Sequence, residues 1–188
     1  MGSSIAYHLA AAGNAGNICV IEPDPTYEWA AASRSTGGVR LMHGLVENIE
    51  MSRYGQEFYR DFANRVDVDG EPSRFDFLEY GYLHLLSGVE NVVIGERNCA
   101  LQNAHGASNA MIDRDELQCR FPSIRNDDID AALYGPRDGF IDPCAAVIGF
   151  RKKARSLGVE YIEDRAVGFE TNSKKIQRVL LQSGRKIN

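Results

Sequence analysis

Apolar residues near the start of the chain recur first with a helical period and then as a short continuous run. Ile5 and Leu9 lie one helical turn apart, and Gly13 follows where a left-handed residue ends a helix. Residues 17–22 form an apolar run that closes on Glu22 before a proline, a pattern typical of a buried parallel strand. We therefore predict a helix that ends before Gly13, followed by a strand.

Caps and turn residues divide the rest of the chain into further elements. Asp113 with Glu116 forms a capping box at the start of a short helix. Asp142 and Pro143 begin another helix as N-cap and first residue, and Gly158 ends it. The remaining periodicity predicts helices over 46–66, 90–104, 114–120 and 145–157. It predicts strands over 77–86 with a bend at Gly81, and over 130–134, 159–162, 166–171 and 176–183.

A helix that opens on glycine, followed by a strand that ends in an acid, is typical of the second half of a dinucleotide-binding βαβ unit. In such a unit the glycine permits close helix–strand packing, the helix N-terminus faces a pyrophosphate, and the acid binds ribose hydroxyls. Gly2 would be the third glycine of Gly-x-Gly-x-x-Gly, so we expect the chain to begin inside this fingerprint. On these residues alone, an ordinary αβ unit in which Glu22 only closes the strand remains an alternative.

Composition and charge narrow the possible partners. The 44% hydrophobic and 25% charged content is that of an ordinary globular protein, and the net charge of −5 argues against nucleic acid and anionic membranes. No apolar run approaches the roughly 20 residues that span a bilayer, and no secretory signal is recognisable. The four cysteines are far apart, which indicates reduced thiols rather than disulfides or a metal site. We expect a cytoplasmic protein, or a mitochondrial-matrix protein if it is eukaryotic.

Residues 30–40 form a loop dense in hydroxyl side chains, with a Gly-Gly pair and two arginines. Few of its side chains are large enough to fill a core. The loop is therefore either a solvated connection or a surface against which a flat, polar ligand lies.

Four stretches together carry a resemblance to a known family. They are Gly2-Ser3-Ser4 with Val20-Ile21-Glu22, the loop 33–40, the strand Gly81-Tyr82-Leu83, and Asp138-Gly139-Phe140-Ile141-Asp142-Pro143 before a helix and Gly158. In order and spacing the chain resembles the FAD-dependent amine and amino-acid oxidoreductases, which include D-amino-acid oxidase, sarcosine oxidase and dimethylglycine dehydrogenase. Residues 22–27 and 47–49 look closest to a branch that includes a mitochondrial flavoprotein linked to complex I assembly.

The resemblance implies a role for each matched position. The implied FAD-binding residues are Gly2, Ser3, Glu22, Ser33, Arg34, Ser35, Thr36, Gly37, Gly38 and Val167. Among them, Gly2 would lie beside the pyrophosphate, Glu22 would bind the ribose, and the backbone at Val167 would meet the adenine. Arg40 would lie near the flavin ring and the substrate carboxylate, and His43 falls where some relatives place a substrate-facing cation. Without the resemblance, Arg40 reads as a surface arginine and His43 as an ordinary loop histidine.

The resemblance also implies a fold and a reaction. The expected fold is α/β with α+β character: a partial Rossmann-like FAD-binding domain over 1–72 and 140–188, and part of a β-rich substrate domain over 73–139. The expected reaction oxidises the C–N bond of a small amine or amino acid by hydride transfer to flavin N5. A non-catalytic assembly or interaction factor on the same fold is the alternative. We expect the chain to be a fragment at both ends and inactive by itself, and its oligomeric state stays open.

Overall fold

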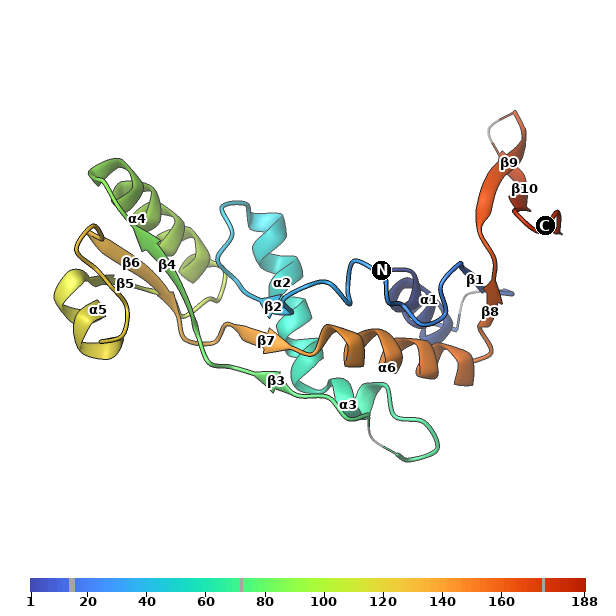
Figure 1. The fold of residues 1–188 in the computed structure, drawn as a ribbon, viewed down its shortest axis with the longest axis horizontal. Helices are drawn as coiled ribbons and strands as arrows, with labels where there is room; N and C mark the ends of the chain where they lie inside the picture. Colours follow the sequence, from blue (N-terminus) through green and yellow to red (C-terminus); the bar gives the residue numbers. More distant parts are fainter. Residues whose placement is uncertain (14–15, 72, 174) are drawn as a thin grey trace. The chain divides into compact units, whose positions relative to one another are not determined.

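The structure is a computed structural model that describes residues 1–13, 16–71, 73–173 and 175–188. The chain forms two compact units (Figure 1). Unit 1 comprises Met1–Ser35, Asn64–Arg74 and Pro143–Asn188, and unit 2 comprises Thr36–Ala63 and Phe75–Asp142. Helices and strands occur in both units, which confirms the mixed α/β class. The domain boundaries expected from the sequence stay a prediction.

Unit 1 is built on a parallel pair of strands and two packed helices. Its elements are α1 (Gly2–Ala11), β1 (Cys19–Glu22), α6 (Pro143–Ser156), β8 (Glu160–Glu163), β9 (Ala166–Asn172), β10 (Lys175–Leu181) and β11 (Lys186–Ile187). Helix α1 packs against α6, where the rings of Tyr7 and Phe150 lie 5.5 Å apart. Strand β1 pairs with β8 alone among the described residues, so it is half-buried and the prediction of a buried strand was wrong.

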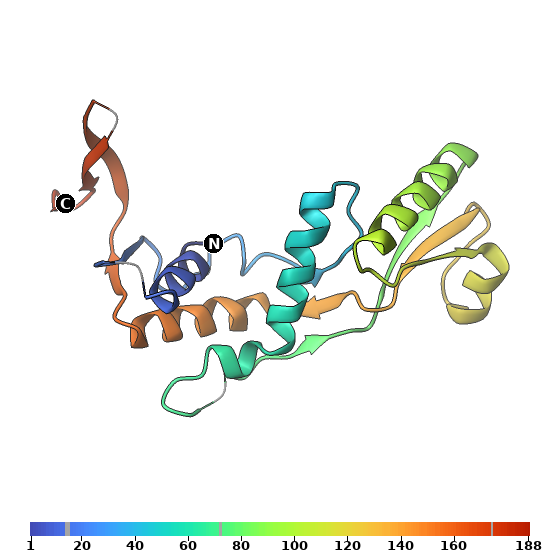
Figure 2. The same ribbon diagram turned by 180° about the vertical axis from the view of Figure 1, so that it is seen from behind.

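Unit 2 contains a three-stranded antiparallel sheet covered on both faces by helices (Figure 2). Its elements are β2 (Gly38–Val39), α2 (Val46–Arg60), β3 (Phe77–Leu78), β4 (Tyr82–Leu86), α4 (Val89–Ala104), β5 (Ala110–Asp113), α5 (Arg114–Arg120), β6 (Ala131–Gly135) and β7 (Gly139–Ile141). The sheet has the order β4-β6-β5, and alternate residues of β6 face opposite sides. Leu133 packs with Cys99 of α4, whereas Ala132 packs with Leu117 of α5.

A second small sheet in unit 2, with the order β2-β7-β3, depends on a close backbone approach. A Cβ added to Gly139 would lie 2.0 Å from the carbonyl oxygen of Leu78, so only glycine fits there. Gly81 has φ +81° and separates β3 from β4, as the predicted bend requires.

The helix ends follow the sequence signals. Asp113 Oδ1 accepts a hydrogen bond from the Glu116 amide at 2.8 Å, α6 begins at Pro143, and Gly13 and Gly158 have φ +69° and +92°. The predicted helix over 46–66 is two helices, because the chain departs from helical geometry at Asp61 (φ −110°, ψ 12°) before α3 (Phe62–Arg65). Pro72 and Lys174, which belong to predicted turns, lie outside the described residues.

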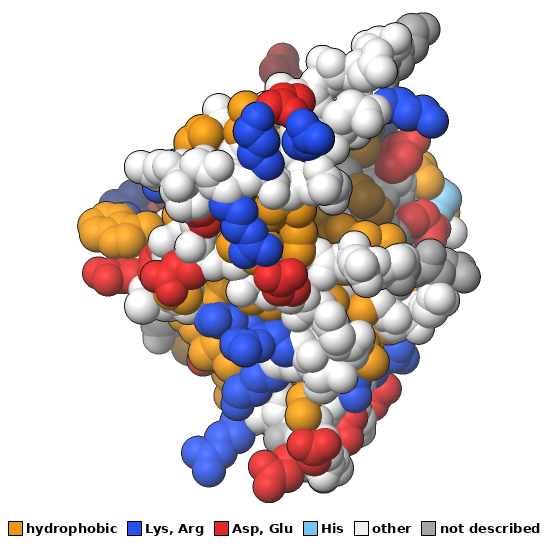
Figure 3. All heavy atoms as spheres, turned by 90° about the vertical axis from the view of Figure 1, so that its right-hand side faces the viewer, with side chains coloured by type: hydrophobic (Ala, Val, Ile, Leu, Met, Phe, Trp, Pro, Cys, Tyr) orange, Lys and Arg blue, Asp and Glu red, His pale blue; other side chains and the backbone are white. Residues whose placement is uncertain are grey.

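The surface carries charges of both signs. On the face shown in Figure 3, Lys and Arg side chains lie among Asp and Glu side chains. None of the helices in the described residues is long and apolar enough to cross a membrane.

Candidate functional site

The parallel strands of unit 1 bring two carboxylates to the same edge. Glu22 ends β1 and Glu163 ends β8, and the two residues are partners in the register of the pair. Ligands of α/β folds bind outside the carboxyl ends of parallel strands. The local sequence thus positions Glu22, and the pairing of distant segments positions Glu163 beside it.

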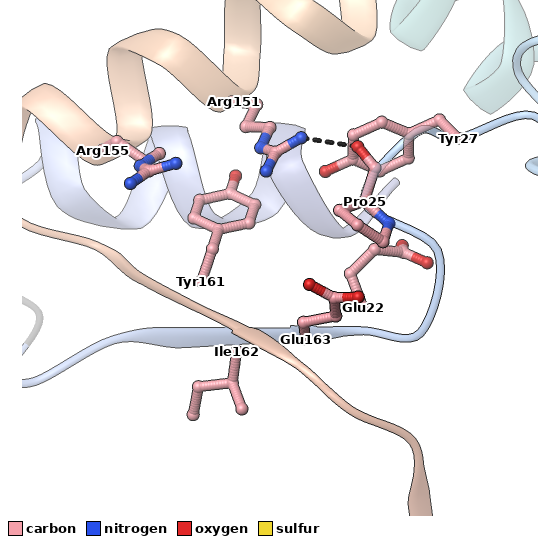
Figure 4. A pocket seen from close by; sticks show the side chains of 8 residues that line it. All are labelled: Glu22, Pro25, Tyr27, Arg151, Arg155, Tyr161, Ile162 and Glu163. Carbon is pink, nitrogen blue, oxygen red and sulfur yellow. Dashed lines mark hydrogen bonds between the residues drawn. The ribbon is translucent and has the colours of Figure 1, made fainter.

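A cavity of about 210 Å³ lies at this edge (Figure 4). Its lining comes from β1, the loop after it, α6 and β8, and consists of Glu22, Pro25, Tyr27, Arg151, Arg155, Tyr161, Ile162 and Glu163. Whole drug-sized ligands occupy roughly 300–1,000 Å³. The cavity is therefore large enough for only one part of a dinucleotide.

Glu22 combines a structural contact with a free oxygen. Its Oε1 accepts a hydrogen bond from the Asp24 amide at 3.0 Å, and its Oε2 makes no hydrogen bond in the described part of the chain. Asp24 in turn accepts hydrogen bonds from the amides of Thr26 (3.0 Å) and Trp29 (3.2 Å), which close the loop after β1. The Glu22 carboxylate is thus held at the cavity with one oxygen available to a ligand.

Arg151 fixes the opposite side of the cavity. Its Nη1 donates to the Pro25 carbonyl at 2.7 Å, and its guanidinium lies over the rings of Tyr27 and Tyr161, 5.4 and 5.5 Å from the ring centroids. Figure 4 shows Tyr161 on the side of Arg151 and Arg155, with Ile162 on the other side of the strand. Arg155 has no ion pair or side-chain hydrogen bond within the described residues.

The first turn of α1 reaches the same loop. The Ser3 hydroxyl lies 3.5 Å from the hydroxyl of Tyr27, which lines the cavity. The N-cap residue Met1 gives no side-chain hydrogen bond, so the first amides of α1 keep their partial positive charge. The packing role expected for Gly2 is not supported, because a Cβ there would lie 3.9 Å from Val20 Cγ1, an ordinary contact.

Tyr161 contributes a second buried hydroxyl. The hydroxyl has no hydrogen-bond partner that satisfies normal geometry among the described residues. Burial raises the pKa of Tyr161, and the nearby Ser3 hydroxyl opposes this shift. A buried hydroxyl without a partner loses about 1–3 kcal/mol relative to a bonded one. This hydroxyl is thus a free polar group beside the cavity.

The other matched residues of unit 1 lie along exposed segments. The guanidinium of Arg34 stacks on the Trp29 ring at 4.3 Å, and the Ser35 amide closes a turn to Ala32 at 2.9 Å. Ser33 is half-buried on the same segment. Val167, on β9, is 59% exposed and does not line the cavity. Of the matched residues of unit 1, the structure therefore places Glu22 in the cavity lining and Ser3 against the lining residue Tyr27.

In unit 2 the Gly37–Gly38 pair lies close to two stacked aromatic rings, Tyr82 and Phe140, which form an aromatic platform. The Ile141 amide donates to the Gly37 carbonyl at 3.0 Å, and a Cβ on Gly38 would lie 3.4 Å from the Tyr82 hydroxyl. Tyr82 stacks on Phe140 with ring centroids 5.4 Å apart. Thr36, which precedes the pair, is exposed.

Arg40 lies beside this platform, and His43 follows it in the chain. The guanidinium of Arg40 is 5.4 Å from the Tyr82 ring centroid, and Arg40 has no acidic partner among the described residues. The His43 ring shares a hydrogen bond with the Ser52 hydroxyl at 2.9 Å. Burial, with the nearby Arg40 and His43, lowers the pKa of His84, whose ring packs at 6.1 Å on Tyr82. Unit 2 thus places the guanidinium of Arg40 and the ring of His84 against Tyr82.

Sequence reasoning missed Arg151, Arg155 and Tyr161. One usable signal was present: Arg151 and Arg155 are four residues apart, which places both on one face of α6. Nothing in the local pattern of β8 marks Tyr161 as a cavity residue.

Comparison with known proteins gives a family match over the whole chain. The family described as "FAD dependent oxidoreductase" matches residues 1–188. A Xenopus laevis protein named FAD-dependent oxidoreductase domain-containing protein 1 is 35% identical over 182 residues, which cover 94% of this chain and 36% of that protein. Rat mitochondrial dimethylglycine dehydrogenase is 26% identical over 161 residues, covering 85% of this chain and 18% of that protein.

A solved structure agrees with the fold. The L-proline dehydrogenase from P. horikoshii superposes with a TM-score of 0.83 at 26% identity, over 97% of this chain and 46% of that one. The chain therefore spans roughly a third of the length of the Xenopus protein and about half of this dehydrogenase subunit.

Proposed function

The chain belongs to the family of FAD-dependent oxidoreductases, and we propose that it forms the adenosine-side FAD site and part of the substrate site of an amine or amino-acid oxidoreductase. The named activities of the dimethylglycine dehydrogenase and L-proline dehydrogenase relatives support a substrate with an oxidisable C–N bond. The finer substrate class, of the sarcosine, dimethylglycine or D-amino-acid type, belongs to the same proposal.

One observation carries the proposal: Glu22, at the end of β1, lines a cavity together with Tyr27, and Ser3 in the first turn of α1 contacts Tyr27. The uncapped amides of α1 suit a phosphate, and the free oxygen of Glu22 suits a ribose hydroxyl. The buried Tyr161 hydroxyl offers another polar contact. These groups fit the adenosine diphosphate half of FAD.

On the substrate side, Arg40 is the residue that we expect to hold a carboxylate. Its guanidinium is supported by the Tyr82 ring and forms no ion pair among the described residues. A guanidinium binds a carboxylate through two parallel hydrogen bonds, which fixes the orientation of the substrate. When bound, FAD supplies the acceptor for the hydride that leaves the substrate carbon. The residues of this chain then need only orient the substrate, and no strong protein base is required.

The test uses the purified, folded protein. Its visible absorbance after desalting measures bound flavin, and reduction of a dye acceptor measures turnover with sarcosine, dimethylglycine, L-proline and D-amino acids. We expect bound flavin and turnover of at least one of these compounds. Bound flavin that no amine reduces would refute the proposed reaction and favour the non-catalytic alternative. Absence of flavin from the folded protein would refute the cofactor site itself.

A further inference from the structure

A buried carboxylate lies beneath the segment that carries Arg40 and His43. Asp138, in the turn between β6 and β7, is 1% exposed. Its Oδ1 accepts hydrogen bonds from the Leu41 amide and from Gln56 Nε2 on α2, both at 2.9 Å. A single carboxylate oxygen therefore binds both the Leu41 amide, just after β2, and the Gln56 side chain on α2.

The backbone of Asp138 is held as firmly as its side chain. Its carbonyl accepts a hydrogen bond from the Gly81 amide at 2.9 Å, and its amide donates to the Gly135 carbonyl at 3.3 Å. Asp138 thus has a fixed position from which it sets the position of Leu41. Leu41 itself is 2% exposed and lies between Arg40 and Met42 in the chain.

The second oxygen of Asp138 is buried without a hydrogen-bond partner. A Cβ built on Gly135 would lie 2.7 Å from Asp138 Oδ2 and 3.0 Å from Asn109 Oδ1, so both acceptors crowd the same glycine. The orientation of the Asn109 amide is fixed, because its Nδ2 donates to Gln102 Oε1 at 2.8 Å. An ionised Asp138 has no proton to donate, so only a protonated carboxyl or an amide in its place could donate a hydrogen bond from the position of Oδ2.

The charges around Asp138 come from two elements. Burial raises the pKa of Asp138, and the hydrogen bonds from Leu41 and Gln56, with the nearby His43 and Arg40, oppose the shift. On α2, Arg60 Nη2 lies 3.4 Å from Gln56 Oε1. A raised pKa in the folded state means that Asp138 favours folding most at acid pH, and that this contribution is lost as pH rises from the ordinary aspartate pKa through the raised one.

We propose that Asp138 is a positioning residue: its Oδ1 holds the Leu41 amide and thereby places Arg40 beside Tyr82 and His43 beside Ser52. The inference rests on the proposed function, because Arg40 and His43 have a substrate role only there. The required element is the hydrogen-bond acceptor at Oδ1 rather than the negative charge. An aspartate in this place lowers folding stability at neutral pH because its second oxygen has no donor.

Two variants of the full-length protein separate the acceptor from the charge. Asp138→Asn keeps an acceptor for the Leu41 amide and removes the negative charge. Asp138→Ala removes the acceptor. We expect Asp138→Ala to raise the KM for the amino-acid substrate about tenfold with a smaller change in kcat and unchanged flavin content. Asp138→Asn should restore the wild-type KM, and its stability relative to wild type should increase as pH rises from 4 to 8.

Hydrogen exchange provides a measurement that needs no turnover. Amide protection of residues 39–44 should fall in Asp138→Ala and persist in Asp138→Asn. Equal loss of protection in both variants, or an Asp138→Asn protein less stable than wild type at pH 8, would overturn the proposal. If no amine reduces the bound flavin of the wild-type protein, the proposed function is refuted. The hydrogen-exchange and stability data would still decide whether Asp138 positions Leu41.

Discussion

Replacement of Glu22 is the most direct test of the cavity in unit 1. The carboxylate is fixed by the Asp24 amide through Oε1 and offers Oε2 to a ligand. Glu22→Ala removes both interactions, whereas Glu22→Gln keeps a neutral acceptor. Because Glu22 is half-buried at the end of β1, water can satisfy the Asp24 amide after either change. We therefore expect the fold to survive in both variants.

The expected effect follows from the type of hydrogen bond. A hydrogen bond to a charged group contributes roughly 1.5–3 kcal/mol. At about 1.4 kcal/mol per decade, its loss raises the dissociation constant for FAD by roughly 10–150-fold. Glu22→Gln should fall at the low end of this range, because a neutral acceptor is retained and only the assistance of the charge is lost.

The assay is titration of the full-length apoprotein with FAD, followed by flavin fluorescence. Glu163→Ala is the matched control, since Glu163 is the register partner of Glu22 and lines the same cavity. If the interaction with Glu22 is a specific ribose contact, Glu163→Ala should change the affinity much less. Equal losses for the two variants would refute the reasoning and attribute the effect to the general charge of the cavity.

Three further predictions concern other described residues. Arg40→Lys should lower turnover about tenfold or more while flavin content stays the same, because bidentate geometry is lost and charge is not; equal turnover would contradict the carboxylate role. Gly139→Ala should lower the free energy of unfolding by about 1–3 kcal/mol or more, since its Cβ meets the Leu78 carbonyl. The control Gly55→Ala, on α2, meets no neighbour and should raise the free energy of unfolding by about 0.5–1 kcal/mol. Urea denaturation measures both variants, and equal changes would be inconsistent with this packing. Tyr161→Phe should leave the thermal stability of the apoprotein unchanged or raise it by about 1 kcal/mol, because the hydroxyl has no partner; a marked loss would reveal a partner.

Sequence signals predicted elements whose causes are local. The cap at Asp113, the first-turn proline Pro143 and the left-handed Gly158 each act within a few residues, so the helices that they delimit were predicted closely. Strands β2, β5, β7 and β11 were missed, because two to four residues with no alternating pattern form a strand only when a partner from another segment supplies the hydrogen bonds. The break at Asp61 was missed because the apolar pattern continues through it into α3.

The same distinction applies to the candidate sites. Glu22 could be placed at the end of a strand from the residues around it. Tyr161 and Asp138 owe their importance to segments far away in the chain: the loop at Tyr27 in one case and the Leu41 amide in the other. No periodicity or cap encodes such contacts. Whether the matched residues bind FAD stays a prediction that the experiments above address.

The pairing of β1 with β8 also has a consequence for the synthesis of the protein. Glu22 and Glu163 are about 140 residues apart, and all of unit 2 lies between them in the chain. At about 5–20 residues per second, the ribosome needs roughly 7–28 s to make the intervening chain. During that time β1 and α1 have been released without their partners β8 and α6, while unit 2 can already fold. We therefore expect chaperones to protect the nascent segment that contains α1 and β1 during translation.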